Sequence, residues 1–336
     1  METLSSAPGT ITDQLPPGYR TREFEDSDRE ALVADRNAEH DPMQQGTADE
    51  WREWERLVPP KNELRLTLVA PDGAVAGTVS IGPGNFERPD GTLHGGVGIL
   101  REHRRRGLGR VLHAVIEDEA RRRGTPRILA GTNAAIPAGL AFATSVGYRE
   151  IGRRIESYVQ LATFDPAPFA PQVARVKEGG ISFVTFAEAL ASRDEAGRKA
   201  FWHELYEAEA PMWEDIPWAA PMPHWSFERF HKLAVQSGKM VHEASLLALD
   251  GRTIAGFTTT ARQGERGHTW MTGTARTHRG RGIALAIKVE MLQRAAVAGL
   301  EAMLTTNDEP NKAMRGINAK LGYVMLPAHI ELEKLL

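Results

Sequence analysis

His103-Arg104-Arg105-Arg106-Gly107-Leu108-Gly109 recurs, in altered form, as His278-Arg279-Gly280-Arg281-Gly282-Ile283-Ala284. The first copy begins at residue 103 and the second at residue 278, an offset of 175 residues. The same offset relates Val146-Gly147-Tyr148 to Leu321-Gly322-Tyr323. A tandem repeat of one domain is the simplest explanation.

Each copy has the form Arg-x-x-Gly-x-Gly/Ala and stands between a strand-like and a helix-like segment. Strand-like runs at 97–100 and 270–275 precede the copies, and Val111, Leu112, Val115 and Ile116 follow the first with helical spacing. The first-turn amides of a helix lack intrahelical acceptors and carry partial positive charge. Glycines allow close approach to the backbone, and neighbouring arginines can bind phosphate. The pattern therefore predicts a pyrophosphate site where a strand turns into a helix.

Two other phosphate-binding loops are excluded by their spacing. A Walker loop requires Gly-x4-Gly-Lys-Ser/Thr and a dinucleotide fingerprint requires Gly-x-Gly-x-x-Gly, and the sequence contains neither. The repeated stretch resembles motif A of the GNAT-type N-acetyltransferases, in which Arg/Gln-x-x-Gly-x-Gly/Ala binds the pyrophosphate of acetyl-CoA. Both halves also share the family's usual ending, a helix that runs into Leu/Val-Gly-Tyr/Phe.

The resemblance covers nearly the whole chain and implies an α/β (α+β) fold made of two tandem GNAT domains. Each domain should have a mixed, mostly antiparallel central sheet with splayed fourth and fifth strands and flanking helices. We expect a flexible tail at 1–17, an N-terminal GNAT domain at 18–164, a proline-rich linker at 165–172 and a C-terminal GNAT domain at 173–336. The hairpin signals Asp72-Gly73 and Asp250-Gly251 independently support the duplication.

The C-terminal domain is expected to carry a longer insertion. Its first helix is predicted over 194–210, and the proline-rich residues 211–223 are predicted to form a loop. In the family, the loop between the first two helices helps to form the acceptor pocket. Trp213 and Trp218 either anchor this loop to its own core or provide an apolar wall for the acceptor.

Composition limits the functions that the chain can have. Of 336 residues 41% are hydrophobic and 25% charged, and the formal net charge is −3, which gives no support to nucleic-acid binding. Cysteine is absent, which excludes disulfides, a catalytic thiol and cysteine-ligated zinc. No apolar run is long enough to cross a bilayer, and residues 1–17 lack the features of a signal peptide. We expect a cytoplasmic monomer or homodimer that needs no metal.

The resemblance assigns cofactor-binding roles in both halves. In the C-terminal half the residues are Thr274, Arg276, Arg279, Gly280, Arg281, Gly282, Ile283, Ala284, Asn307 and Asn311. In the N-terminal half they are Ile99, Arg104, Arg105, Arg106, Gly107, Leu108, Gly109 and Arg110. The backbones of Thr274 and Ile99 are expected to pair with the pantetheine arm like an added strand. Asn311 best matches a family asparagine that bonds to the cofactor, and helix capping is the competing interpretation for these asparagines.

Two features suggest that the N-terminal half is partly degenerate or that proton transfer differs from the family pattern. Ile136, next to Pro137, stands opposite Asn311, so that half lacks the asparagine. Many members also place a tyrosine five residues before the final aromatic, where it protonates the CoA thiolate. Here those positions are Asn318 and Ala143, and neither side chain can act as that acid.

Candidate bases are defined by position alone. In several family members an acidic residue eleven positions before the motif arginine serves as base, and His268 takes that position here. Histidine's ordinary pKa suits proton removal near neutrality, although a strand-end histidine without a function is the competing interpretation. Glu214 and Asp215, together with Glu209, should border the acceptor and are alternative bases or ammonium-binding carboxylates.

We therefore expect transfer of an acetyl group from acetyl-CoA to a primary amine of a small-molecule acceptor, by direct attack on the thioester. The layout is similar to that of the mycothiol synthases, tandem members whose C-terminal half is active. Alternatively, the N-terminal domain is an acyl-CoA-binding or structural module, or the acceptor is a protein amine. A nucleic-acid-binding function rests only on the arginine cluster at 101–110.

Overall fold

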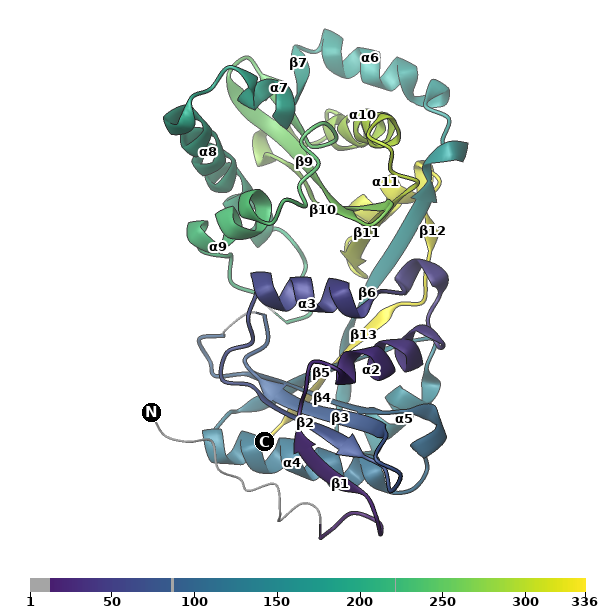
Figure 1. The fold of residues 1–336 in the computed structure, drawn as a ribbon. Coiled ribbons are helices and arrows are strands. Elements are labelled where there is room, and N and C mark those ends of the chain that lie inside the picture. The colour runs from purple at the N-terminus through teal and green to yellow at the C-terminus, as the bar shows by residue number, and fades with distance from the viewer. Residues whose placement is uncertain (1–12, 86–87, 221) are drawn as a thin grey trace. The chain divides into compact units, whose positions relative to one another are not determined.

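A computed structural model describes residues 13–85, 88–220 and 222–336. The chain divides into two compact units, coloured along the chain in Figure 1. Unit 1 contains residues 1–153, 219–223 and 327–336, and unit 2 contains residues 154–218 and 224–326. Most of the expected tail, residues 1–12, lies outside the described residues, whereas Leu15 is buried in the core of unit 1. Over the described ranges, no helix has the length and hydrophobicity needed to span a membrane.

Unit 1 is a sheet flanked by helices. The sheet has the order β1-β2-β3-β4-β5-β13-β6, in which β4 and β5 are parallel and β1 to β4 are antiparallel. Its strands are β1 (Arg20–Glu23), β2 (Leu64–Val69), β3 (Val75–Gly82), β4 (Leu93–Ile99), β5 (Arg127–Asn133), β13 (His329–Leu335) and the start of β6 (Arg149–Gln160). Its helices are α2 (Asp28–Asn37), η1 (Pro42–Gln44), α3 (Ala48–Leu57), η2 (Arg101–His103), α4 (Leu108–Arg123) and α5 (Pro137–Ser145).

Unit 2 repeats this plan with the sheet order β6-β11-β10-β9-β8-β7, and β12 pairs with β6. The strands after β6 are β7 (Ile181–Thr185), β8 (Leu246–Asp250), β9 (Thr253–Gln263), β10 (Arg266–Thr274), β11 (Ala302–Asp308) and β12 (Val324–Met325). The helices are η3 (Leu161–Thr163), η4 (Ala167–Phe169), α6 (Ala170–Glu178), α7 (Phe186–Ala191), α8 (Glu195–Glu214), α9 (Phe227–His231), η5 (Lys232–Gln236), η6 (Arg276–His278), α10 (Ile283–Val297) and α11 (Lys312–Lys320). Each unit is thus a mixed and mostly antiparallel sheet with helices, which confirms the predicted fold class.

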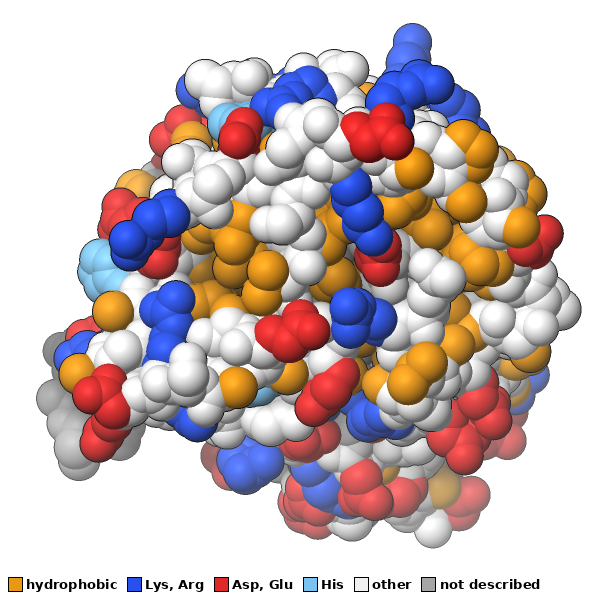
Figure 2. All heavy atoms as spheres, turned by 90° about the horizontal axis from the view of Figure 1, so that it is seen from above, with side chains coloured by type: hydrophobic (Ala, Val, Ile, Leu, Met, Phe, Trp, Pro, Cys, Tyr) orange, Lys and Arg blue, Asp and Glu red, His pale blue; other side chains and the backbone are white. Residues whose placement is uncertain are grey.

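The helices of unit 2 cover opposite faces of its sheet. Leu246 and Ala248 pack with residues of α10, whereas Leu247 between them packs with residues of α8. Because side chains of a strand alternate between faces, α8 and α10 lie on opposite sides, as Figure 1 shows. Figure 2 shows one face of the molecule, on which apolar side chains gather in a hollow bordered by charged ones.

The last strand of each repeat lies in the sheet of the other unit. In unit 2, residues 154–160 of β6 pair antiparallel with β11, with Arg154 opposite Asp308. In unit 1, β13 pairs antiparallel with β5, with His329 opposite Asn133. The offset of 175 residues relates Arg154 to His329 and Asn133 to Asp308, so the two pairings are equivalent. The two copies exchange the same strand.

This exchange moves the unit boundaries away from the expected domains. The division falls between Arg153 and Arg154, inside β6, whereas the expected linker at 165–172 contains η4 and the start of α6. Residues 327–336, expected in the C-terminal domain, belong to unit 1. The boundary depends on long-range strand pairing, which the spacing of the repeat does not reveal.

The first long helix of unit 2 is longer than predicted. The sequence predicts its end near residue 210, whereas α8 continues through Pro211 to Glu214. Proline lacks an N–H donor and usually disturbs a helix. Here the next residue, Met212, is buried, and its sulfur packs where a Cβ on Gly273 would stand. This close packing on β10 favours the extra turn.

Candidate active site

Two left-handed residues shape the motif loop in each unit. Gly280 and Gly282 have φ values of 77° and 82°, and Arg105 and Gly107 at the equivalent positions have 64° and 80°. A left-handed conformation is unfavourable for residues with a Cβ, which explains the glycines. The loops are alike although Arg105 replaces a glycine in the first copy.

Each loop ends at the exposed amides of a helix. Gly282 is the N-cap of α10 and Gly107 is the N-cap of α4, and neither helix has a side-chain cap. The first intrahelical bond of α10 comes from the Ala286 N–H, so the amides of the first turn have no partner within the helix. Ile283 and Leu108 are 1% exposed, so these two can offer a ligand only their backbone.

The motif arginine of unit 2 is engaged within the protein. Arg279 donates from Nε to the carbonyl of Thr274 at 3.1 Å, and its Nη2 binds Asp215. Arg276 binds the same carboxylate, with Nη2 2.6 Å from Oδ1. The bonds from Arg276 and Arg279 lower the pKa of Asp215 to about 2. Asp215 is therefore a fixed anion that holds two predicted cofactor arginines, and it is a poor base.

The motif arginine of unit 1 is held in the same way. Arg104 donates from Nε to the carbonyl of Ile99 at 2.8 Å, and its Nη2 lies 2.6 Å from Glu39 Oε2 and 3.4 Å from Asp35 Oδ2. In both units this arginine ties the motif to the end of the preceding strand. The carbonyls of Ile99 and Thr274 are thereby occupied by arginine, although the sequence predicts that these residues pair with pantetheine.

The other predicted arginines make weaker or more exposed contacts. Arg281 binds Asp250 at 3.2 Å and the Gly179 carbonyl at 2.8 Å. In unit 1, Arg106 donates to the Tyr19 hydroxyl, Arg110 donates to Ser145, and Arg105 has no hydrogen bond or ion pair with the described residues. Gly109 packs beside Phe142, and Ala284 is partly exposed at the start of α10.

The strands that lead to and from the motif helix separate. β10 and β11 pair from Arg266–Ala302 to Thr269–Thr305, and beyond this pair each strand continues without the other. In unit 1, β4 and β5 pair only at Leu93–Ile128 and His94–Leu129. In unit 2 the gap opens towards the motif loop, so unpaired strand edges lead to uncapped helix amides.

His268 lies near the point where the strands of unit 2 separate. Its Nε2 is 3.4 Å from the Thr306 hydroxyl, and its Nδ1 is enclosed without a partner among the described residues. Burial, with a smaller effect of the Arg154 charge, lowers the pKa of His268 to about 4. The ring is neutral at pH 7 but is a weak base. Glu214, the third predicted catalytic residue, is mostly exposed and lies 3.8 Å from Arg276.

The asparagines of unit 2 have structural partners. Asn311 caps α11, with Oδ1 accepting the Met314 N–H at 3.2 Å, as the competing interpretation expects. Asn307 Oδ1 accepts from Asn318 Nδ2 at 2.7 Å. Asn318 is buried, so the position of the family's tyrosine is filled by an amide bonded to another amide.

Unit 2 also contains a buried amine that the sequence motifs do not indicate. Lys288 of α10 is completely buried, and its Nζ has no partner among the described residues. Burial lowers its pKa to about 7. In unit 1 the equivalent residue is His113, whose ring is 5.5 Å from that of Tyr148. A charged residue within the apolar run Leu285–Val289 was the available signal.

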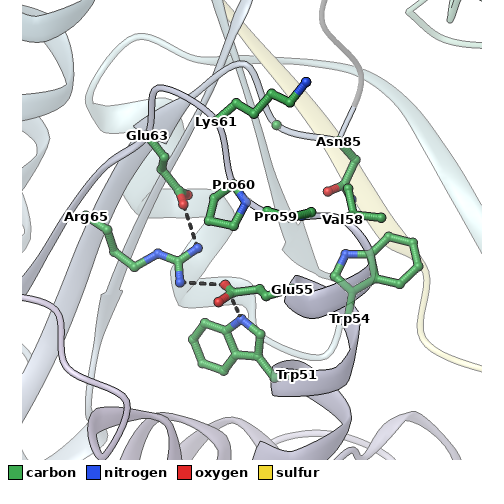
Figure 3. Close-up of a pocket in the computed structure, with 11 residues that line it drawn as sticks. Trp51, Trp54, Glu55, Val58, Pro59, Pro60, Lys61, Glu63, Arg65 and Asn85 are labelled. Carbon is green, nitrogen blue, oxygen red and sulfur yellow. Dashed lines mark hydrogen bonds and ion pairs between the residues drawn. The ribbon is translucent and has the colours of Figure 1, made fainter. Parts of the chain in front are cut away.

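Unit 1 also contains a surface pocket, shown in Figure 3, that lies outside the predicted sites. Its open volume is about 590 Å³, part of it open solvent. Trp51 and Arg65 both donate to Glu55, at 2.8 and 2.6 Å, and Arg65 also binds Glu63. These polar groups satisfy one another. None of the predicted cofactor or catalytic residues lines this pocket.

Comparisons with known proteins agree with the repeat. The family model described as the acetyltransferase (GNAT) family matches residues 23–148 and, separately, residues 202–323. A GCN5-related N-acetyltransferase from Sphaerobacter thermophilus is 22% identical, with a TM-score of 0.72 and 96% of each chain covered. A tandem GNAT protein from the clavulanic acid biosynthesis pathway is 17% identical, with a TM-score of 0.66 and coverage of 94% of this chain and 98% of that one. At these sequence identities, the two structures show only that their folds resemble that of this chain. A comparison with curated proteins found no match.

Proposed function

The chain belongs to the GNAT acetyltransferase family, and from that premise we propose that unit 2 transfers an acetyl group from acetyl-CoA to a primary amine of a small molecule. One arrangement carries the proposal. β10 and β11 separate after Thr269 and Thr305, and the gap opens towards the uncapped amides of α10. Such a site suits a long ligand that ends in phosphates.

The residues at the motif loop fit a pyrophosphate. The backbone amides of 280–284 include those of two left-handed glycines, which carry no Cβ, and are candidate donors. Arg276, Arg279 and Arg281 lie beside these amides, where they form ion pairs with Asp215, Asp250 and, at 3.8 Å, Glu214. We infer that the amides bind the phosphates and that the arginines supply the surrounding charge.

Acetyl-CoA would supply an activated acetyl carbon at the closed end of the gap. There the residues of this chain have three tasks. The edge of β10 beyond Thr269 would hold the pantetheine arm, and a backbone N–H of that edge would stabilise the oxyanion. A base would remove the proton of the ammonium, because the protonated nitrogen has no lone pair for attack.

A second candidate function concerns unit 1, which we propose as an acyl-CoA-binding module. The φ values of its motif loop match those of unit 2, and α4 is likewise uncapped. Its α5 begins with Pro137 and lacks the asparagine of α11. The related alternative, that the acceptor of unit 2 is a protein amine, differs only in the substrate.

Two experiments test both proposals. The first is calorimetric titration with acetyl-CoA, and the second is a screen of amines that detects the free thiol of CoA. Two sites per chain and turnover of an amine would support both. One site would refute the idea that both units bind acetyl-CoA. No binding at all would refute the acetyltransferase.

A further inference from the structure

Glu209 is a buried carboxylate of unit 2 without a partner. Its side chain is on α8 and 9% exposed, and it forms no hydrogen bond or ion pair with the described residues. The buried carboxylate of Asp28, by contrast, binds Arg22 at 2.6 Å, and buried Glu119 binds Arg122 at 2.6 Å. A buried carboxylate without a partner is costly to the fold. Its presence calls for a functional explanation.

Two contacts locate Glu209 along β10. Asp215, just after α8, binds Arg276 beyond the end of β10, and Met212 packs on Gly273. The end of α8 therefore runs alongside β10 in the same direction. Glu209 is three residues before Met212, which is about 4.5 Å back along the helix. Strand residues are about 3.3 Å apart, so this distance corresponds to between one and two residues of β10 before Gly273. The carboxylate is thus level with Met271.

Met271 lies just beyond the point where β10 and β11 separate. The last paired residue of β10 is Thr269. The register shifts between Thr269 and Met271, so the strand is irregular here. Under the proposed function the thioester lies at this closed end of the gap. Glu209 is therefore beside the place where the acetyl carbon would be attacked.

Glu209 and His268 approach this place from the same face of the sheet. His268 pairs with Ala261 and Gly273 pairs with Phe257, and Phe257 belongs to the core formed with α8. Residues directly paired on neighbouring strands share a face, and so do alternate residues of a strand. Under the proposed function an acceptor would reach the gap from the face of α8, because α10 covers the other face.

Aromatic rings flank the carboxylate on α8. Tyr206 is three residues before Glu209 and Trp213 is four after it, so both are neighbours on the helix surface. Both rings contact His224, with centroids 4.8 and 5.5 Å apart, and Trp218 lies 4.9 Å from Trp213. These rings are half-buried. Ring faces beside a carboxylate suit an ammonium group on an apolar skeleton.

We propose that Glu209 binds the acceptor as its ammonium and acts as the base, and that the ring cluster of Tyr206, Trp213, Trp218 and His224 binds the apolar part of the acceptor. One ammonium proton passes to Glu209, which leaves a lone pair on nitrogen. The C–N bond forms, the C–S bond breaks with its electrons on sulfur, and a second nitrogen proton ends on the thiolate. The acceptor is then a primary amine on an aromatic or apolar skeleton. This inference rests on the proposed acetyltransferase function.

The charge state of Glu209 agrees with its position. Burial raises its pKa to about 7, so it can take up and release a proton near neutrality. The lower pKa values of His268 and Asp215, about 4 and about 2, make both weaker bases.

The test compares Glu209→Gln with Glu204→Gln, which changes an exposed glutamate of the same helix. Tryptamine and glucosamine serve as acceptors, and acetyl-CoA binding is measured by calorimetry. We expect wild-type kcat/KM to be at least tenfold higher for tryptamine. Glu209→Gln should lower it roughly 10²- to 10⁴-fold and remove the limb that rises with pH near 7. Both variants should keep the acetyl-CoA dissociation constant within about twofold, which also shows that they fold.

The contrary results distinguish failure of Glu209 as the base from failure of the acetyltransferase function. A wild-type chain that does not bind acetyl-CoA would refute the proposed function itself. If it binds acetyl-CoA but Glu209→Gln keeps the rate and the pH limb, Glu209 is not the base. A preference for glucosamine, or turnover of neither amine, would overturn the aromatic or apolar acceptor.

Discussion

The Nζ of Lys288 lies 4.9 Å from the centroid of the Tyr323 ring, inside the core of unit 2. The ring face gives this amine its only described favourable contact, and no described hydrogen-bond acceptor reaches it. A cation–π contact offsets part of the cost of burying a charge but replaces no hydration shell. The fold therefore favours the neutral form of Lys288.

We predict that Lys288→Met stabilises the protein at pH 7, by on the order of 4 kcal/mol, because each unit by which burial lowers the pKa corresponds to about 1.4 kcal/mol. The pKa of Lys288 falls from the ordinary 10.5 to about 7 in the folded chain, so the unfolded chain binds more protons between these values. The stability of the wild type should therefore rise with pH from about 7 to 10.5, as the penalty is removed, and the variant should lack this rise. Urea unfolding at pH 6, 8 and 10 measures both effects.

Lys312→Met on the exposed surface of α11 is the matched control. It should change the stability by less than about 0.5 kcal/mol and leave the pH dependence as in the wild type. A destabilised Lys288→Met protein would mean that the ammonium has a partner that the described structure does not show.

Gly282→Glu should abolish acetyl-CoA binding by unit 2. The new side chain must adopt a left-handed backbone, its Cβ would meet Gln172 Nε2 at 2.9 Å, and its carboxylate would face the phosphates. The backbone strain alone amounts to about 1–2 kcal/mol. Gly282→Ala has this strain without the charge and should bind more weakly than wild type but measurably. An equal loss of acetyl-CoA affinity in both variants would mean that backbone strain and the added Cβ, and not the carboxylate charge, weaken binding.

Gly107→Glu should reduce two calorimetric sites to one. A Cβ at Gly107 meets nothing within 4 Å, so the change adds charge and backbone strain without a clash. Turnover should persist if unit 2 alone is catalytic. Loss of turnover with Gly107→Glu and its survival with Gly282→Glu would reverse the assignment of the two units.

Asp215→Asn should strengthen acetyl-CoA binding at low salt, by about three- to tenfold. The change removes the negative charge shared by Arg276 and Arg279 and leaves Arg279 free to face the phosphates, while Arg276 keeps its ion pair with Glu214 at 3.8 Å. The gain should shrink at high salt, because exposed charges are screened. Calorimetry at two salt concentrations measures it. Weaker binding at both would show that Asp215 is needed to hold the arginines in place.

Local signals allowed much of the fold to be predicted. The sequence Thr47-Ala48-Asp49-Glu50 is typical of a capping box, and Thr47 and Glu50 form one at the start of α3. The glycines of the motif have the positive φ that their residue type favours. Features that depend on distant partners were not predictable. The sequence does not show that Asp215 binds Arg279, 64 residues away, or that Glu209 lacks a partner. Strand exchange is the largest such feature. The spacing of the repeat is the same whether a final strand pairs within its own copy or with the other copy, so the spacing does not reveal the exchange.

The strand exchange leads to a prediction about Leu332. This residue of β13 is 2% exposed, lies opposite Ala130 of β5 and packs in the core of unit 1. Its equivalent in the first copy is Ser157 of β6, so the two strands are not interchangeable in that core. Leu332→Ala should destabilise unit 1 by about 2–5 kcal/mol because it opens a cavity.

Hydrogen exchange resolves which unit is affected. With Leu332→Ala, the amides of β5 in unit 1 should exchange faster, whereas those of β11 in unit 2 should keep their wild-type rates. Leu335→Ala at the end of the same strand is the control, because Leu335 is 63% exposed and should leave both strands unchanged. If each copy kept its own last strand, β6 would pair with β5 in the first copy and β13 would pair with β11 in the second. Faster exchange in β11 and not in β5 would therefore show that each copy keeps its own last strand.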